Sequence, residues 1–133
     1  ADLRSTPGPT LTARLLQATS ALDGDPPIVI DIDERRPPRP ALIGDLTSIV
    51  TEAARNAHLH SKASKILILG RIHRDWGTAQ VRDDGLGFDP THEPEGHFGL
   101  IGMRERAEKI GATIEFDSMS GTGTTVTIEW GNK

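Results

Sequence analysis

Apolar residues recur at helical spacing in three stretches of the chain. The most regular stretch runs from Pro40 to His60, where apolar positions three and four residues apart form one continuous stripe. Pro40 suits the first turn of a helix, because a backbone N–H at that position needs no partner. The same period over 11–22 and 100–110 predicts two shorter helices, the second ending before Gly111, a natural C-terminal cap.

Short runs rich in β-branched residues alternate with these predicted helices. They cover residues 28–32, 66–69, 78–81, 113–116 and 124–130. The polar turn at 74–77 joins the second run to the third, and the turn at 120–123 joins the last two, so each pair predicts a hairpin. Because strands in adjacent pairs favour antiparallel neighbours, we expect an α/β two-layer sandwich, with a mixed, largely antiparallel sheet and helices on one face.

The chain divides into a lead-in and one folded unit. Residues 1–27 hold the Pro- and Gly-containing start and the first short helix, whereas 28–133 hold every predicted strand. Residues 35–40 carry too much Arg and Pro to form a core element and predict a connector. A length of 133 residues fits a single domain overall.

Composition removes several classes of function. A formal net charge of −4 and the lack of any long Lys/Arg run give no electrostatic footprint for nucleic acid or an anionic membrane surface. The chain has no Cys, which excludes disulfides and thiolate metal sites. No apolar run approaches the roughly 20 residues that a bilayer span requires. A phosphate-bearing ligand would therefore need a local site.

Two polar residues, Glu52 and Asn56, lie one turn apart on the flank of the stripe in the longest predicted helix. The amide oxygen of Asn56 is a suitable ligand for Mg²⁺, and the carboxylate of Glu52 could orient a nucleophile or hold a metal-bound water. Taken alone, such a pair is more often the solvated shoulder of a buried helix. Other motifs have to decide between the two interpretations.

The segment 83–87, which reads Asp-Asp-Gly-Leu-Gly, directly follows a predicted strand, where loops commonly form binding crevices. Its glycines let the backbone approach a ligand, and a buried carboxylate at Asp83 can accept a hydrogen bond from an exocyclic amine such as that of adenine. The alternatives are a surface turn or a calcium loop. Calcium fits poorly, because Leu86 and Phe88 stand at positions unsuited to an EF-hand pattern.

Two further glycine-rich segments lead into a helix and a strand. In 96–103, free backbone N–H groups and the helix dipole would meet a phosphate. The segment lacks the Gly-Lys-Ser/Thr of a Walker loop, and a flexible helix entry is its plain alternative. The second segment, 121–124, reads Gly-Thr-Gly-Thr and is by itself a common hairpin turn.

In this order the four segments resemble the ATP-binding domain shared by sensor histidine kinases, DNA gyrase, heat-shock chaperone ATPases and mismatch-repair ATPases. Residues 52–57 look like that family's N box, 83–87 its Asp-x-Gly-x-Gly box, 99–103 its second glycine box and 121–124 its last. The resemblance covers residues 28–130. The stretch 99–107 further resembles sensor kinases paired with helix-turn-helix response regulators, such as nitrate, redox and oxygen sensors.

The resemblance implies a protein-histidine kinase domain that binds ATP and Mg²⁺. In such a domain Asp83 bonds the adenine amino group, with Thr124 supporting it through water. Asn56 ligates Mg²⁺, and Glu52 is the catalytic carboxylate. The other nucleotide contacts implied by the resemblance are His60, Gly85, Gly87, Gly99, Leu100, Gly102 and Met103.

The resemblance also implies the partners. The γ-phosphoryl group passes to a histidine on a separate helical dimerisation domain of the same polypeptide and is relayed to a response regulator. We expect the full-length protein to be a homodimer, cytoplasmic or the cytoplasmic part of a membrane-bound sensor. The fragment itself is expected to be monomeric, without nucleic acid or direct membrane contact. Since 1–22 is too short for a four-helix dimerisation unit, we expect nucleotide binding without autophosphorylation.

One departure from the family pattern leaves alternatives open. Leu59 precedes His60 where the family usually has Lys or Arg, so one phosphate contact is missing. Arg104 and Arg106 either replace that charge or form an ordinary solvated helix face. His58 is expected to be structural or on the surface. Two rival interpretations are an anti-sigma-factor-type serine kinase and a degenerate nucleotide-binding interaction domain.

Overall fold

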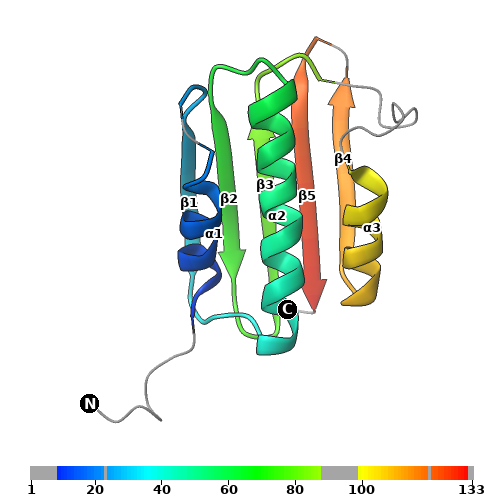
Figure 1. Cartoon of the computed structure of the whole chain (residues 1–133). Coiled ribbons are helices and arrows are strands. Elements are labelled where there is room, and N and C mark those ends of the chain that lie inside the picture. Colours follow the sequence, from blue (N-terminus) through cyan, green and yellow to red (C-terminus); the bar gives the residue numbers. More distant parts are fainter. Residues whose placement is uncertain (1–8, 23, 88–98, 120, 132–133) are drawn as a thin grey trace.

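The fold has two layers, a sheet and a layer of helices on one of its faces (Figure 1). The structure is a computed structural model, and it describes residues 9–22, 24–87, 99–119 and 121–131. The helices are α1 (Leu11–Thr19), α2 (Pro40–His60) and α3 (Leu100–Lys109), and the strands are β1 (Ile28–Glu34), β2 (Ile66–Ile72), β3 (Trp76–Asp83), β4 (Thr113–Met119) and β5 (Gly123–Gly131). The predicted α/β two-layer sandwich is confirmed.

The strand order across the sheet is β1-β2-β3-β5-β4. β1 pairs with β2 in parallel, and the other neighbours are antiparallel, so the sheet is mixed and largely antiparallel as predicted. The last strand enters between β3 and β4. This insertion brings the start of β5 beside the end of β3, where Asp83 and Thr124 are register partners.

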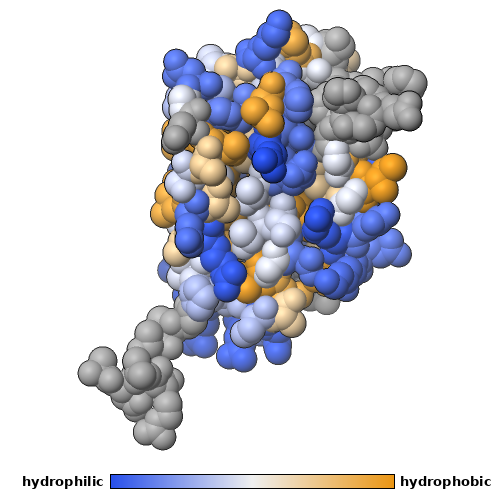
Figure 2. Space-filling view, viewed as in Figure 1, coloured by the Kyte–Doolittle hydropathy of each residue, from blue (hydrophilic) through white to orange (hydrophobic). Residues whose placement is uncertain are grey.

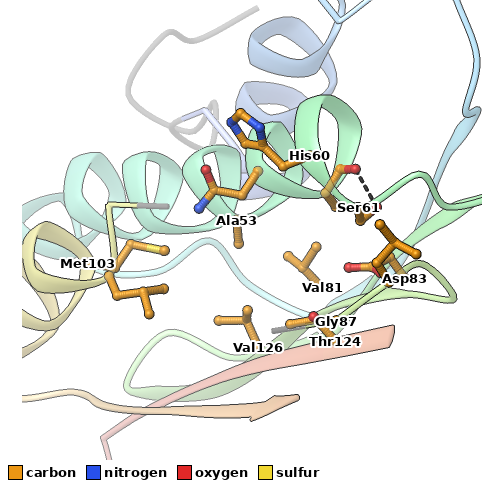
Figure 3. A pocket seen from close by; sticks show the side chains of 13 residues that line it. Ala53, His60, Ser61, Val81, Asp83, Gly87, Met103, Thr124 and Val126 are labelled. Carbon is orange, nitrogen blue, oxygen red and sulfur yellow. Dashed lines mark hydrogen bonds between the residues drawn. The ribbon is translucent and has the colours of Figure 1, made fainter. Parts of the chain in front are cut away.

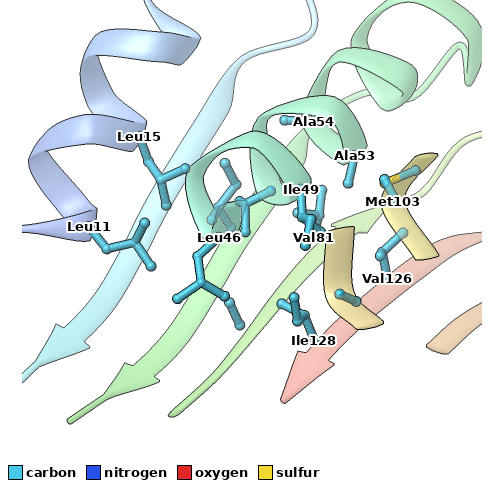
Figure 4. Close-up of a cluster of buried hydrophobic side chains, with 14 of the residues drawn as sticks. Leu11, Leu15, Leu46, Ile49, Ala53, Ala54, Val81, Met103, Val126 and Ile128 are labelled. Carbon is cyan, nitrogen blue, oxygen red and sulfur yellow. The ribbon is translucent and has the colours of Figure 1, made fainter. Parts of the chain in front are cut away.

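The core lies between the sheet and the helices (Figure 4). Alternate residues of β3 and β5 face the helical layer, because successive side chains of a strand point to opposite faces. The stripe of α2 meets them across the middle of the sheet, and α3 covers β4. The side chains that are most completely buried include Leu11, Leu15, Leu46, Ile49, Ile66, Ile68, Ile72, Leu100, Met103 and Ile128.

Helix α1 packs into this same core, against α2 and β1. The carboxylate of Glu34, at the end of β1, accepts the backbone N–H groups of Leu11 and Thr12, each at 2.8 Å, and the Thr12 hydroxyl at 2.6 Å. It therefore satisfies N–H groups that a helix start leaves without an intrahelical partner. α1 ends at Thr19, earlier than the predicted 22, and Leu22 still packs partly buried against the core.

The hairpin between β2 and β3 is tighter than the predicted turn at 74–77. Trp76 and Gly77 belong to β3, and a Cβ atom on Gly77 would lie 2.4 Å from the ring of Trp130 on β5. Glycine lets the indole lie flat against the strand there. Among the described helices, none combines the length and the apolar character that a bilayer span requires.

Candidate functional site

A cavity of about 260 Å³ opens between the C-terminal half of α2, the start of α3, and the ends of β3 and β5 that meet there (Figure 3). We call it the main cavity. Seven residues singled out from the sequence line it: Asn56, His60, Asp83, Gly87, Leu100, Met103 and Thr124. Six other described residues also line it: Ala53, Ala57 and Leu86 lie within the predicted motifs but were not predicted as contacts, and Ser61, Val81 and Val126 were missed by sequence reasoning. Most of the missed residues are small or apolar and form the walls.

Among the lining residues that the structure describes, Asp83 is the one carboxylate. It is the last residue of β3 and faces the helical layer like Val81, two positions earlier. Partial burial raises the pKa of Asp83, and the neighbouring carboxylate of Asp84 adds to the rise, whereas hydrogen bonds from the backbone N–H groups of Gly85 and Thr124 oppose it. The Gly85 N–H donates to Oδ1 at 2.9 Å. A partly desolvated acceptor thus faces an apolar cavity and suits an N–H donor on a ligand.

Thr124 is the register partner of Asp83 on the neighbouring strand β5, and it is buried. Its hydroxyl is 2.7 Å from the hydroxyl of Ser118 on β4, which also donates to the carbonyl of Gly123 at 3.1 Å. Either hydroxyl could donate in this pair; when Ser118 gives its one proton to Gly123, Thr124 is the donor to Ser118. The lone pairs of Thr124 are then left to accept. Sequence reasoning missed Ser118.

Residues 84–87 are held between the end of α2 and the β4–β5 turn. Leu86 N–H donates to the Ser61 carbonyl at 2.6 Å, and the Leu86 carbonyl accepts the N–H of Gly121. Asp84 accepts the Ser64 hydroxyl and the Ser64 N–H, the latter at 2.8 Å. These two bonds, the hydroxyl first, lower the pKa of Asp84.

The glycines of this segment are needed for close backbone contacts. A Cβ atom on Gly85 would lie 2.2 Å from the Ser61 carbonyl oxygen. Gly87 has a φ of +68°, and a Cβ there would lie 2.0 Å from the carbonyl oxygen of Met119. Gly85 is therefore a support of the main cavity rather than part of its lining.

On α2, Asn56 and His60 line the main cavity one turn apart. Glu52 lies one turn earlier and is not among the lining residues. Its carboxylate is beside Gly99 instead, since a Cβ on Gly99 would lie 3.0 Å from Glu52 Oε1. Gly99 caps α3 in the left-handed conformation, with a φ of 61°, and provides no capping side chain.

On α3, Leu100 and Met103 face the main cavity, whereas Gly102 lines a separate hollow beside α2 with Asp45 and Arg106. Neither Arg104 nor Arg106 lines the main cavity. The Arg104 guanidinium lies over the Phe116 ring, 4.9 Å from its centroid. A replacement of the charge missing at position 59 by either arginine therefore stays a prediction.

The neighbours of His60 differ in their surroundings. The Leu59 side chain is 58% exposed at the end of α2. Both ring nitrogens of His58 are buried and lack a hydrogen-bond partner among the residues that the structure describes.

Phe88, Ser120 and the lead into the second glycine box at 96–98 lie outside the described residues. Within those described, no group of three or more His, Asp or Glu side chains could by itself hold a metal ion.

The residues that build this site lie within a stretch that matches a known family model. The model describes the "Histidine kinase-, DNA gyrase B-, and HSP90-like ATPase" family and matches residues 42–132, more than half of the chain. The match includes α2 from residue 42 onward, the segment 83–87 and the whole of strands β3 and β5. It therefore covers every residue of the main cavity.

Curated relatives match the chain in sequence, and solved structures match its fold. The chain is 44% identical over 86 residues to the nitrate/nitrite sensor protein NarQ of Escherichia coli. This match covers 64% of this chain and 15% of NarQ. It is 33% identical over 102 residues to the sensor protein VraS of Staphylococcus saprophyticus, covering 77% and 29%. A blue-light activated histidine kinase of Erythrobacter litoralis shares the fold, with a TM-score of 0.69, 21% identity, and coverage of 91% of this chain and 40% of that one.

Proposed function

Because the chain belongs to the histidine kinase-, DNA gyrase B- and HSP90-like ATPase family, we propose that it is the ATP-binding catalytic domain of a two-component sensor histidine kinase. The observation that carries the proposal is the pairing of Asp83 with Thr124 at the edge of an apolar cavity. The chain spans only 15% to 29% of the length of NarQ and VraS. The activity of the whole protein is therefore part of the proposal.

Adenine is the base that the main cavity fits. Its exocyclic amine would donate to the Asp83 carboxylate, and Thr124 would accept from that amine or from a water beside it. Val81, Val126 and Met103 supply apolar surface for the ring faces. Guanine in the same orientation would place its O6 carbonyl oxygen where adenine places its amine, and this would leave a partly buried carboxylate facing an acceptor, which disfavours it.

The phosphates would lie toward the start of α3. Gly99 carries no side chain there, and the first N–H groups of a helix together with its dipole favour an anion. Asn56 would hold Mg²⁺ through its amide oxygen; one protein ligand is enough, because Mg²⁺ commonly keeps water and phosphate oxygens as its other ligands. Bound Mg²⁺ would neutralise charge on the phosphates. His60 lines the same side of the cavity and is assigned as a nucleotide contact.

Glu52 is proposed as the catalytic carboxylate. It lies beside Gly99, where the phosphate end of the nucleotide would be, and not beside the base-binding residues. From there it can accept a hydrogen bond from the imidazole that attacks the γ-phosphorus. The lone pair of the neutral imidazole nitrogen forms the new P–N bond, the bond between the γ-phosphorus and the β–γ bridging oxygen breaks, its electron pair leaves with ADP, and the proton on the other ring nitrogen can pass to the Glu52 carboxylate.

The histidine acceptor is proposed to lie on a helical dimerisation domain of the same polypeptide, in a homodimer, with relay to a response regulator. Because the reaction uses ATP, we place it on the cytoplasmic side. Sensor proteins such as NarQ and VraS support this assignment by similarity. Leu59 leaves the end of α2 without the basic group common in the family, so we expect modest phosphate affinity.

The proposal is tested by two measurements on the same protein. Calorimetric titration with ATP and Mg²⁺ should show binding, and its absence at millimolar nucleotide would reject the ATP-binding assignment. Labelled ATP should then be added with candidate acceptor-helix domains, and acid-labile phosphohistidine should form. Acid-stable phosphoserine on a partner would favour the anti-sigma-factor-type kinase, and binding without any transfer would favour the degenerate interaction domain.

A further inference from the structure

A second cavity, of about 420 Å³, lies at the opposite end of the sheet from the main cavity. It is bounded by the start of α2, the connector 35–39 that precedes it, and the turn between β2 and β3. Figure 1 shows the start of α2 at the same end of the sheet as the turn from β2 to β3, whereas α2 finishes at the other end. In the part of the chain that the structure describes, the two cavities share no lining residue.

Four arginines from three separate segments line this second cavity: Arg14 of α1, Arg36 and Arg39 of the connector, and Arg74 of the β2–β3 turn. We call it the arginine cavity. Arg39 is paired with Asp75 at 2.6 Å. The other three have no acidic partner among the residues that the structure describes. All four side chains are exposed, and in a chain with a net charge of −4 their convergence creates a local positive surface that attracts an anion.

The arginine cavity is held in shape by backbone contacts. Arg39 N–H donates to the Arg74 carbonyl at 3.3 Å, and Arg35 N–H donates to the Ile72 carbonyl at 2.9 Å. These bonds fix the connector onto the β2–β3 turn. Two arginine-bearing segments are thereby held together before any ligand binds, which lowers the entropic cost of binding.

The floor of the arginine cavity is apolar. Pro38 is buried, Ile43 is 7% exposed, and both line the cavity. Helix α2 begins here with no capping side chain and no acidic residue in its first turn, so its positive dipole end adds to the arginine charge. Figure 2 shows hydrophilic residues with small hydrophobic areas between them at this end of the molecule. A ligand that fits both features carries carboxylates and an apolar group.

We propose that the arginine cavity binds an acidic peptide segment of a partner protein, with carboxylates on Arg14, Arg36 and Arg74 and an apolar side chain against Pro38 and Ile43. Guanidinium groups suit carboxylates because they form paired, charge-assisted hydrogen bonds. An inorganic anion would use only the arginines and leave the apolar floor uncovered. This is a binding site separate from nucleotide binding.

The test uses fluorescence anisotropy with a labelled peptide of four aspartates flanking one leucine. We expect binding to this chain at low salt that weakens as salt rises. Two control peptides, one with asparagine for every aspartate and one with glycine for the leucine, should each bind more weakly. The proposal is overturned if either control peptide binds as tightly as the aspartate peptide. It is also overturned if the aspartate peptide does not bind at low salt.

Variants locate the contact. The double variant Arg36→Ala/Arg74→Ala should weaken peptide binding by about fivefold for each arginine removed. The matched control is Arg82→Ala, which removes an exposed arginine of β3 that does not line the cavity. Equal affinity of the double variant and the control overturns the proposal, as does displacement of the peptide by inorganic phosphate at equal concentration. The double variant and Arg82→Ala should bind ATP with the same affinity. A failure of the peptide test is therefore distinguishable from a failure of the ATP-binding test of the proposed function.

Discussion

Asp83 and Thr124 are directly opposed on the antiparallel strands β3 and β5, and both face the main cavity. This relationship depends on the insertion of the last strand beside β3. It places a carboxylate and a hydroxyl with free lone pairs at one edge of an apolar cavity. Two acceptors in this position select a ligand that donates.

Asp83→Asn is expected to weaken ATP binding by at least tenfold. The amide can still accept the Gly85 N–H, but it presents a neutral group to the adenine amine, and a hydrogen bond to a charged partner contributes about 1.5–3 kcal/mol. Isothermal titration calorimetry measures the change. Asp31→Asn, on an exposed position of β1, is the matched control and should bind ATP as the parent does. Equal affinity of Asp83→Asn and the parent contradicts the base assignment.

The pH dependence of stability should have opposite signs at Asp83 and Asp84. Burial raises the pKa of Asp83 above its ordinary 3.8, so its stabilising contribution is present below the unfolded pKa and lost as pH rises through the folded pKa. Hydrogen bonds from Ser64 lower the pKa of Asp84, so its contribution is present above the unfolded pKa and lost as pH falls through the folded value.

Thermal melts of the ligand-free parent, Asp83→Asn and Asp84→Asn between pH 3 and 7 measure this difference. Relative to the parent, Asp83→Asn should gain melting temperature as pH rises, whereas Asp84→Asn should lose it. A falling curve for Asp83→Asn would show that burial is not the main influence on Asp83, and a rising curve for Asp84→Asn would contradict the effect of Ser64 on Asp84.

Asn56→Ala should leave ATP binding largely insensitive to Mg²⁺. The variant loses the amide oxygen proposed to hold the ion, while the base contacts at Asp83 and Thr124 remain. Titrations with ATP in Mg²⁺ and in EDTA are compared for the variant and for Arg55→Ala, an exposed neighbour on α2. A metal dependence in Asn56→Ala as large as that of Arg55→Ala rejects Asn56 as a ligand.

Two glycine-to-alanine substitutions should change stability in opposite directions. At Gly85 the new Cβ meets the Ser61 carbonyl oxygen, and such overpacking costs about 1–3 kcal/mol. At Gly44, inside α2, nothing lies within 4 Å of the Cβ position, and alanine should stabilise the helix by about 0.5–1 kcal/mol. Urea denaturation measures the free energy of unfolding of both variants. An unchanged free energy of unfolding for Gly85→Ala would mean that the backbone of the segment 84–87 shifts at little cost.

The local elements could be predicted because their patterns are regular. The helix at Pro40–His60 matches its prediction, since a long amphipathic stripe has one interpretation. The position of β5 between β3 and β4 could not be predicted, because strand pairing across the sheet depends on contacts between distant residues. The same holds for the parallel pairing of β1 with β2.

Within the candidate site, local motifs found the residues with distinctive chemistry and missed their supports. Ser118, which orients the Thr124 hydroxyl, is an ordinary strand serine with no local signal. Gly102, which its motif predicts to be a nucleotide contact, lies about 200° around α3 from Leu100, so the two face different hollows, and its contact with the nucleotide stays a prediction. Motif membership thus identifies the segment, and the helical phase decides which of its residues reach the cavity.

The contacts that hold the segment 84–87 to Ser61 and Gly121 are made by the backbone of Leu86, and its side chain is 51% exposed at the rim of the main cavity. The folded state therefore places little constraint on the side chain at position 86. An inhibitor extended from the cavity toward this rim would contact a side chain that the core does not fix. Selectivity in drug design would be sought here, since the deeper walls are committed to the core.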